Sequence, residues 1–181
     1  MKPANHKVIW QGIHFQAIQY QEEVEPGVFK TFEYVSRKDG TRTIAINEND
    51  EVLLSYEKRF ELEGAYDWRI PGGRLNDEKE PIIDAAKREF KEETGYIAEN
   101  WIFLWTSTPD STVKYQRHFF LATKLKFTEA SRDPGELIEI HWIPFEKANE
   151  MALRGEIREE ISALALLRLF FESKNGSRTL R

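Results

Sequence analysis

The chain of 181 residues contains no cysteine. That absence excludes disulfide-stabilised folds, thiolate zinc sites, iron–sulfur clusters and cysteine nucleophiles. The longest apolar stretch, residues 161–171, is interrupted by Arg168 and is far shorter than the roughly 20 residues that a membrane span needs. The N-terminal residues show no apolar run behind their lysines, so no secretory signal is predicted. We therefore expect a cytoplasmic protein with no membrane contact.

An excess of basic charge is also lacking. Lysine and arginine total 26 against 31 aspartates and glutamates, which gives a net charge of −5. A general nucleic-acid binder needs a basic face to displace counterions, so a nucleic-acid partner is not expected. The 40% of apolar and 31% of charged residues instead indicate a globular protein, and the length favours one main domain.

Strand and helix signals alternate irregularly along the chain, which favours an α+β fold over a doubly wound parallel sheet. Segment 1–37 reads as an N-terminal β segment, 38–174 as the main domain and 175–181 as a polar tail. Within the main domain we expect strands at 41–47, 51–56, 67–70, 96–106, 115–127 and 137–143. Helices are expected at 81–94, 145–154 and 157–173.

The segment with chemical content is the expected helix 81–94. Glu89, Glu92 and Glu93 stand at i, i+3 and i+4 and therefore project from one helix face. Three carboxylates this close repel one another, and a hard divalent cation such as Mg²⁺ relieves that repulsion. A solvated acidic face is the alternative, and it is the commoner meaning of a charge run. Asp84 and Arg88 are four residues apart and are expected to pair.

The residues around this helix resemble the Nudix box. That pattern has a glycine, five residues, a glutamate, seven residues and then Arg-Glu-apolar-any-Glu-Glu-any-Gly-apolar. Its fixed positions are filled here by Gly73, Glu80, Arg88, Glu89, Phe90, Glu92, Glu93, Gly95 and Tyr96. One additional residue stands between Gly73 and Glu80, in a loop where an insertion is tolerated.

The resemblance implies a Nudix fold, with a mixed β-sheet sandwiched between helices and a small N-terminal β segment in addition. It also implies Mg²⁺, or Mn²⁺ in its place, held by Glu89, Glu92, Glu93 and the backbone carbonyl of Gly72. The implied reaction is hydrolysis of a diphosphate, in which Glu93 acts through the metal. Glu136 in a loop after the box matches the position of the general base, and Glu139 is the second choice.

Beyond the box, the chain resembles ADP-ribose pyrophosphatases. In that subgroup an arginine at the position of Arg59 contacts the diphosphate, and an N-terminal sheet is exchanged between two subunits. The resemblance therefore implies a nucleoside diphosphate sugar as substrate, with ADP-ribose first and GDP-mannose or a similar compound next, and a homodimer. Arg69 stands where relatives usually have a glutamate, which brings an additional cation near the substrate.

Two other functions stay open from the sequence. A Nudix enzyme of this kind can instead act on nucleoside triphosphates, dinucleoside polyphosphates or capped RNA, although the N-terminal segment favours sugar nucleotides. The fold can also serve as a non-catalytic sensor of a nucleotide sugar. The complete set of Glu89, Glu92 and Glu93 speaks against a sensor, because pure binding does not require repelling carboxylates.

Overall fold

The structure is a computed structural model that describes residues 5–77, 79–132 and 134–177. Parts of the expected loop at Asp133 and of the expected tail at 178–181 lie outside these ranges. The strands are β1 Lys7–Gln11, β2 Phe15–Glu25, β3 Val28–Arg37, β4 Gly40–Ala45, β5 Glu51–Arg59, β6 Ala65–Arg69, β7 Tyr96–Ser107, β8 Val113–Lys114, β9 Arg117–Phe127 and β10 Ile138–Pro144. The helices are η1 Phe60–Leu62, α1 Ile82–Thr94, α2 Phe145–Leu153 and α3 Glu160–Lys174.

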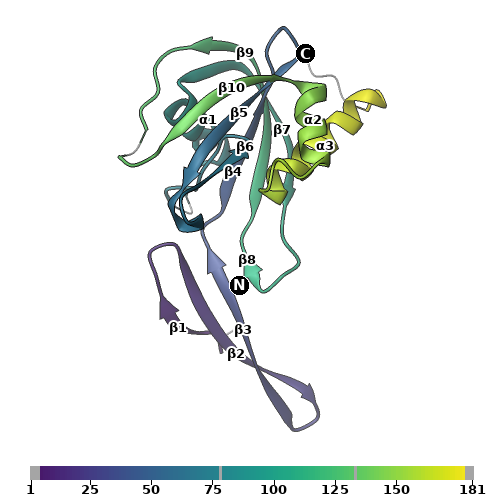
Figure 1. The fold of residues 1–181 in the computed structure, drawn as a ribbon. Helices are drawn as coiled ribbons and strands as arrows, with labels where there is room; N and C mark the ends of the chain where they lie inside the picture. Colours follow the sequence, from purple (N-terminus) through teal and green to yellow (C-terminus); the bar gives the residue numbers. More distant parts are fainter. Residues whose placement is uncertain (1–4, 78, 133, 178–181) are drawn as a thin grey trace.

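Two three-stranded sheets form the body of the molecule (Figure 1). One has the order β10-β5-β6 and is antiparallel, and the other has the order β4-β9-β7 with β4 and β9 parallel. Helix α1 packs against β4 and β7, whereas α2 packs against β5, β10 and α3. The expected α+β class, with mixed sheets between helices, is confirmed.

Side chains on both faces of the central strands are buried, because neighbouring strand residues point to opposite faces. Ile44, Leu54 and Leu121 lie in the cluster that α2 and α3 cover. Their sequence neighbours Ala45, Leu53 and Ala122 join Phe90 of α1 in a second cluster. The alanines leave room for the phenylalanine ring, and this seats α1 close to the sheets.

Helix α1 follows the expected 81–94 closely. Pro81 lies just before the helix, in extended backbone, where a missing N–H costs nothing. At the other end Gly95 adopts φ of 78° and donates its N–H to the carbonyl of Lys91. A left-handed residue at this place is glycine's usual role in ending a helix.

Helix α3 starts three residues later than expected, at Glu160 instead of 157. Glu159 stands in extended backbone just before the first turn, with φ of −68° and ψ of 101°. Its carboxylate is bonded to Arg42, on a strand more than a hundred residues earlier in the chain. This long-range contact is not readable from helical periodicity.

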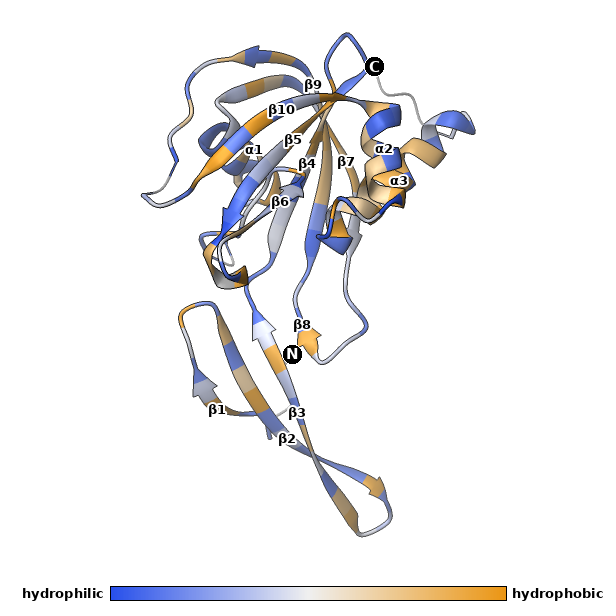
Figure 2. Cartoon of the chain, in the orientation of Figure 1, coloured by the Kyte–Doolittle hydropathy of each residue, from blue (hydrophilic) through white to orange (hydrophobic). Residues whose placement is uncertain are grey.

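The N-terminal strands form a separate sheet with the order β1-β2-β3-β8, which extends away from the body (Figure 1). Apolar residues recur along β1, β2 and β3 (Figure 2), and several stay exposed: Trp10 at 52% and Phe29 at 62%. The sheet lacks a covering layer within the described chain. None of the described helices is long and apolar enough to span a membrane.

Candidate functional site

A cavity of about 670 Å³ opens where the two body sheets, the Pro-Gly-Gly turn and α1 meet. It brings together six residues that the sequence singled out: Arg59, Arg69, Gly72, Glu89, Glu93 and Glu136. They come from the ends of β5 and β6, from the turn after β6, from α1 and from the loop before β10. Residues spread over nearly eighty positions of sequence thus share one cavity.

The Pro-Gly-Gly turn lies directly against α1. The Gly72 N–H donates to Glu93 Oε2 at 2.8 Å. Gly72 has φ of +140°, and a Cβ there would overlap the backbone of Thr41. A Cβ on Gly73 would overlap the carboxylate of Glu89. Only two glycines allow the turn to approach both carboxylates this closely.

The two carboxylates of α1 that line the cavity are partly buried, and their pKa values are raised. Burial raises the pKa of Glu93 to about 8, the charge of Glu57 adds to the rise, and Arg42 opposes it. Burial also raises the pKa of Glu89, while its bond to Arg88 lowers it. The charge of Glu136 contributes to the same rise in Glu89, so the two carboxylates lie within electrostatic reach of each other. A cation between these carboxylates would favour their charged forms.

Arg88 holds the acidic residues in place, but not through the expected pair. Its guanidinium binds Glu80 through Nε at 2.9 Å and Nη2 at 3.2 Å, and it also reaches Glu89 at 2.8 Å. The expected pairing with Asp84 is wrong among the described contacts. Glu80 offers two oxygens to the planar fork, which is the stronger, bidentate geometry.

Two expected site residues lie outside the cavity. The side chain of Glu92 is 42% exposed and binds Arg88 Nη1 at 3.1 Å. Glu139 on β10 is 64% exposed, and its carboxylate lies 3.5 Å from His141 Nε2. Strand alternation explains the second case, because Ile138 lines the cavity and its neighbour Glu139 faces away from it.

An arginine–glutamate cluster behind the turn was not foreseen. Arg42 is 4% exposed, and its Nη2 lies 2.7 Å from Glu159 Oε1, while Arg69 Nη1 lies 3.2 Å from the same oxygen. Burial alone would raise the pKa of Glu159, but the two arginines lower it to about 2. The one available signal was a charged residue inside the buried strand Gly40–Ala45.

The expected metal ligands differ in how well they fit that role. Glu89 and Glu93 offer carboxylate oxygens, the donors that hard divalent cations prefer. The Gly72 carbonyl instead accepts a hydrogen bond from Arg42. In the described part of the chain no three acidic or histidine side chains converge on one ion. The site therefore consists of a carboxylate pair, with its remaining donors to come from backbone, substrate or water.

Comparison with known proteins identifies the family to which the chain is similar. The model of the family described as NUDIX domain matches residues 36–166. A CMP-5'-(N-acetyl-N-hydroxy-3-aminopropyl)phosphonate hydrolase from Streptomyces rubellomurinus is 30% identical over 78% of this chain and 69% of its own length. ADP-ribose pyrophosphatases from Mycobacterium tuberculosis and Bacillus subtilis are 27% and 28% identical, over 86% and 81% of this chain and 76% and 81% of theirs. A solved structure of an ADP compounds hydrolase matches with TM-score 0.76 and 20% identity over 94% of both chains.

The raised pKa of Glu93 predicts a pH-dependent stability in metal-free buffer. Its folded-state pKa of about 8 exceeds the ordinary 4.5, so its contribution is complete below about pH 4.5 and is lost as the pH rises to about 8. Glu93→Gln imitates the protonated form and should lack this loss. Urea unfolding with EDTA should show the wild type losing on the order of a few kcal/mol relative to the variant between pH 5 and 8. Parallel pH profiles would contradict the assignment.

Proposed function

The chain belongs to the Nudix family and is a Nudix hydrolase, and from that premise we propose that it hydrolyses the diphosphate linkage of a nucleoside diphosphate sugar. ADP-ribose is the first candidate substrate, and GDP-mannose or a similar compound is the next. The products are a nucleoside monophosphate and a sugar phosphate. The observation that carries the proposal is the partly buried pair Glu89 and Glu93 held against the glycine turn, in a cavity lined by arginines.

Nudix hydrolases generally use divalent metal ions, and the proposed ion here is Mg²⁺, with Mn²⁺ as a substitute. Glu89 and Glu93 would hold it, because they line the cavity and Glu92 does not, and the Gly72 carbonyl accepts from Arg42. When bound, the ion neutralises charge on the diphosphate and activates the phosphorus for attack. The side chains around the pair orient the substrate and accept the proton of the attacking water.

The charge of the cavity supports an anionic substrate. Eight basic and five acidic side chains line it, so it is basic within a chain whose net charge is −5. Arg59 is the proposed contact to the diphosphate, because a guanidinium fork suits phosphate oxygens. Arg69 lies in the same cavity, but its bond to Glu159 makes it a support for the site.

We assign Glu136 as the general base. It lines the cavity and influences the pKa of Glu89, so it lies near the ion-binding pair. A base must reach the attacking water directly or through one further water. Glu139 faces away from the cavity, with its carboxylate 3.5 Å from His141 Nε2, so it serves as the matched control rather than as the base.

A substrate panel tests the function directly. Wild-type protein with Mg²⁺ should release phosphomonoester-bearing products from nucleoside diphosphate sugars such as ADP-ribose, and cleavage of nucleoside triphosphates or dinucleoside polyphosphates alone would refute the proposed substrate class. A CMP phosphonate belongs in the panel because one relative is named for hydrolysing one. Glu93→Gln should lower kcat by about a hundredfold or more, since electrostatic stabilisation of the transition state is lost. Turnover unaffected by EDTA and by this variant would refute the metal assignment.

Glu136→Gln should lower kcat by roughly 10²–10⁴-fold, the range expected for loss of a general base. Affinity for Mn²⁺, measured by calorimetry, should change little because the proposal assigns the ion to Glu89 and Glu93 and not to Glu136. Glu139→Gln is the control, as it removes the same charge three residues further along a neighbouring strand. Equal rates for wild type and Glu136→Gln would move the base elsewhere.

We further propose that segment 1–37 is exchanged between two subunits of a homodimer. Strand β1 is the free edge of its sheet, and such an edge pairs readily with another chain. Exposed apolar side chains, among them Trp10, Ile13 and Phe29, are arranged along the same segment. Exposed apolar side chains that recur along a segment in this way are consistent with a protein interface. The cytoplasmic location expected from the sequence stays a prediction.

Sedimentation equilibrium should therefore give twice the chain mass of 21.3 kDa. Phe29→Ser in the hairpin should weaken the dimer by tenfold or more in Kd, as roughly 2 kcal/mol of apolar burial is lost. Phe171→Ser on α3 is the control, because its ring is similarly exposed at 69% but lies on the body. A wild-type monomer at micromolar concentration would refute the exchange.

A further inference from the structure

Two arginines of the cavity form no ion pair with the carboxylates of residues 5–77, 79–132 and 134–177. Arg117, the first residue of β9, is 6% exposed, and its Nε and Nη1 have no hydrogen-bond partner. The Nε of Arg37, the last residue of β3, is also buried without a partner. Neither forms an ion pair with any carboxylate that the structure describes, whereas Arg42 and Arg69 share Glu159. Arg37 is partly exposed, whereas the unpaired charge of Arg117 is buried, and a buried charge is costly unless a ligand completes its hydrogen bonds.

The fold holds this pair in place despite the cost. Burial, together with the charges of Arg42 and Arg37, lowers the pKa of Arg117 to about 9. The guanidinium carbons of Arg37 and Arg117 each lie 5.1 Å from the centre of the Tyr115 ring. Gly40 pairs with Arg117 between β4 and β9, and a Cβ on Gly40 would overlap the Arg117 guanidinium. Tyr115 and Gly40 thus leave a defined position for the guanidinium groups of Arg37 and Arg117.

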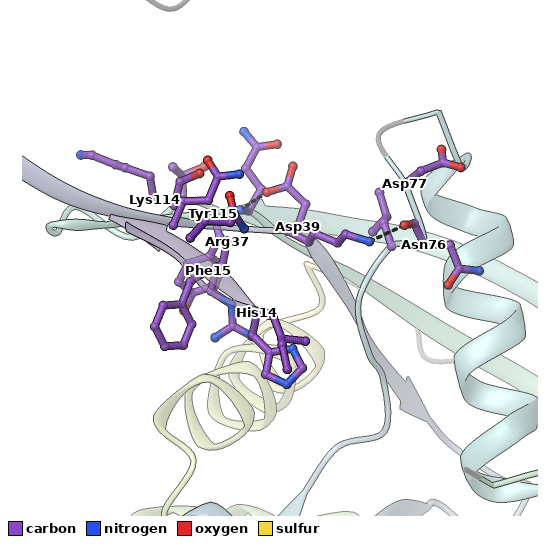
Figure 3. Close-up of a pocket in the computed structure, with 16 residues that line it drawn as sticks. His14, Phe15, Arg37, Asp39, Asn76, Asp77, Lys114 and Tyr115 are labelled. Carbon is purple, nitrogen blue, oxygen red and sulfur yellow. Dashed lines mark hydrogen bonds between the residues drawn. The ribbon is translucent and has the colours of Figure 1, made fainter. Parts of the chain in front are cut away.

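The pair comes from other elements than the groups assigned to the cleaved diphosphate, and Arg117 lies in the same cavity as those groups, next to the Gly73 turn. Arg59 belongs to β5 in one body sheet and Arg117 to β9 in the other, while Glu89 and Glu93 come from α1. Arg37 also lines a second cavity of about 830 Å³ that adjoins the first. Figure 3 shows Arg37 beside Tyr115 there, with Phe15 and His14 of the N-terminal segment close by. A ligand can therefore extend past the carboxylate pair toward these arginines.

We propose that Arg37 and Arg117 bind a third phosphoryl group of the substrate, additional to the two phosphates of the linkage that is cleaved. This proposal rests on the proposed function and narrows its substrate class. The third group is carried either in a longer phosphate chain or as a phosphomonoester on a ribose. Guanidinium groups bind either form through the same charge-assisted hydrogen bonds. The alternative, that the arginines hold the cleaved diphosphate itself, is an outcome of the test.

The first arm of the experiment uses inorganic phosphate and metal-free protein with EDTA. Phosphate should raise the Tm of the wild type and of Arg154→Gln, an exposed arginine outside the cavity. Arg117→Gln should lack this rise, and without phosphate its Tm should not fall, because an unpaired buried charge is removed. Arg117→Met is a second variant in case the amide is poorly accommodated. An equal phosphate effect in both Arg117 variants and the wild type would overturn the proposal.

The second arm compares ADP-ribose with ADP-ribose 2′-phosphate and with diadenosine triphosphate, all with Mg²⁺. Arg117→Gln should lower the preference in kcat/KM for a substrate with the third phosphoryl group by roughly tenfold, the loss expected for one hydrogen bond to a charged group. If only the preference for ADP-ribose 2′-phosphate falls, the third group is a phosphomonoester on a ribose. If only the preference for diadenosine triphosphate falls, it belongs to a longer phosphate chain. Equal losses on all three substrates would assign the arginines to the cleaved diphosphate and overturn the proposal.

The two arms separate this inference from the function beneath it. If the wild type hydrolyses none of these compounds with Mg²⁺, the proposed function fails, and the phosphate arm still decides whether Arg117 makes an anion site. If the wild type hydrolyses ADP-ribose but phosphate has no Arg117-dependent effect, only the inference fails.

Discussion

The contact between two consecutive glycines and two carboxylates of α1 governs the site. Gly72 donates to Glu93, and Gly73 lies against Glu89, so the turn and the helix fit only without side chains on the turn. The rotation of the helix is set from its opposite face, where Phe90 is fully buried against Ala45, Leu53 and Ala122. Hydrophobic burial on one side of α1 therefore places charge on the other.

That placement has an electrostatic cost, which the surrounding arginines limit. Arg88 binds Glu80, Glu89 and Glu92 near the surface, while Arg42 and Arg69 share Glu159 behind the turn. Glu93 keeps a raised pKa because Arg42 only partly offsets its burial and the charge of Glu57. Groups whose pKa values are pushed from their usual range in a cavity are typical of functional sites.

The cavity and the chain as a whole carry opposite charge. An acidic surface disfavours nonspecific contact with polyanions, and the basic cavity attracts a small anion into a confined space. Carboxylates suited to a cation and guanidinium groups suited to phosphates line the same cavity, and this combination suits a substrate that arrives as a metal–diphosphate complex. The N-terminal sheet borders the same region through His14, which contacts Arg74 beside the turn.

The sequence by itself determined the helix, its glutamates and the glycine turn, because helical spacing and the need for glycine are local properties of the chain. It also predicted the α+β class and most strands to within a few residues. The tertiary structure alone decided which acids share a cavity. Glu139 faces away, Arg88 binds Glu80 rather than Asp84, and Glu159 reaches Arg42 across the fold. Such pairings depend on how strands align and on where burial leaves charges without water, and neither is encoded in the spacing of nearby residues.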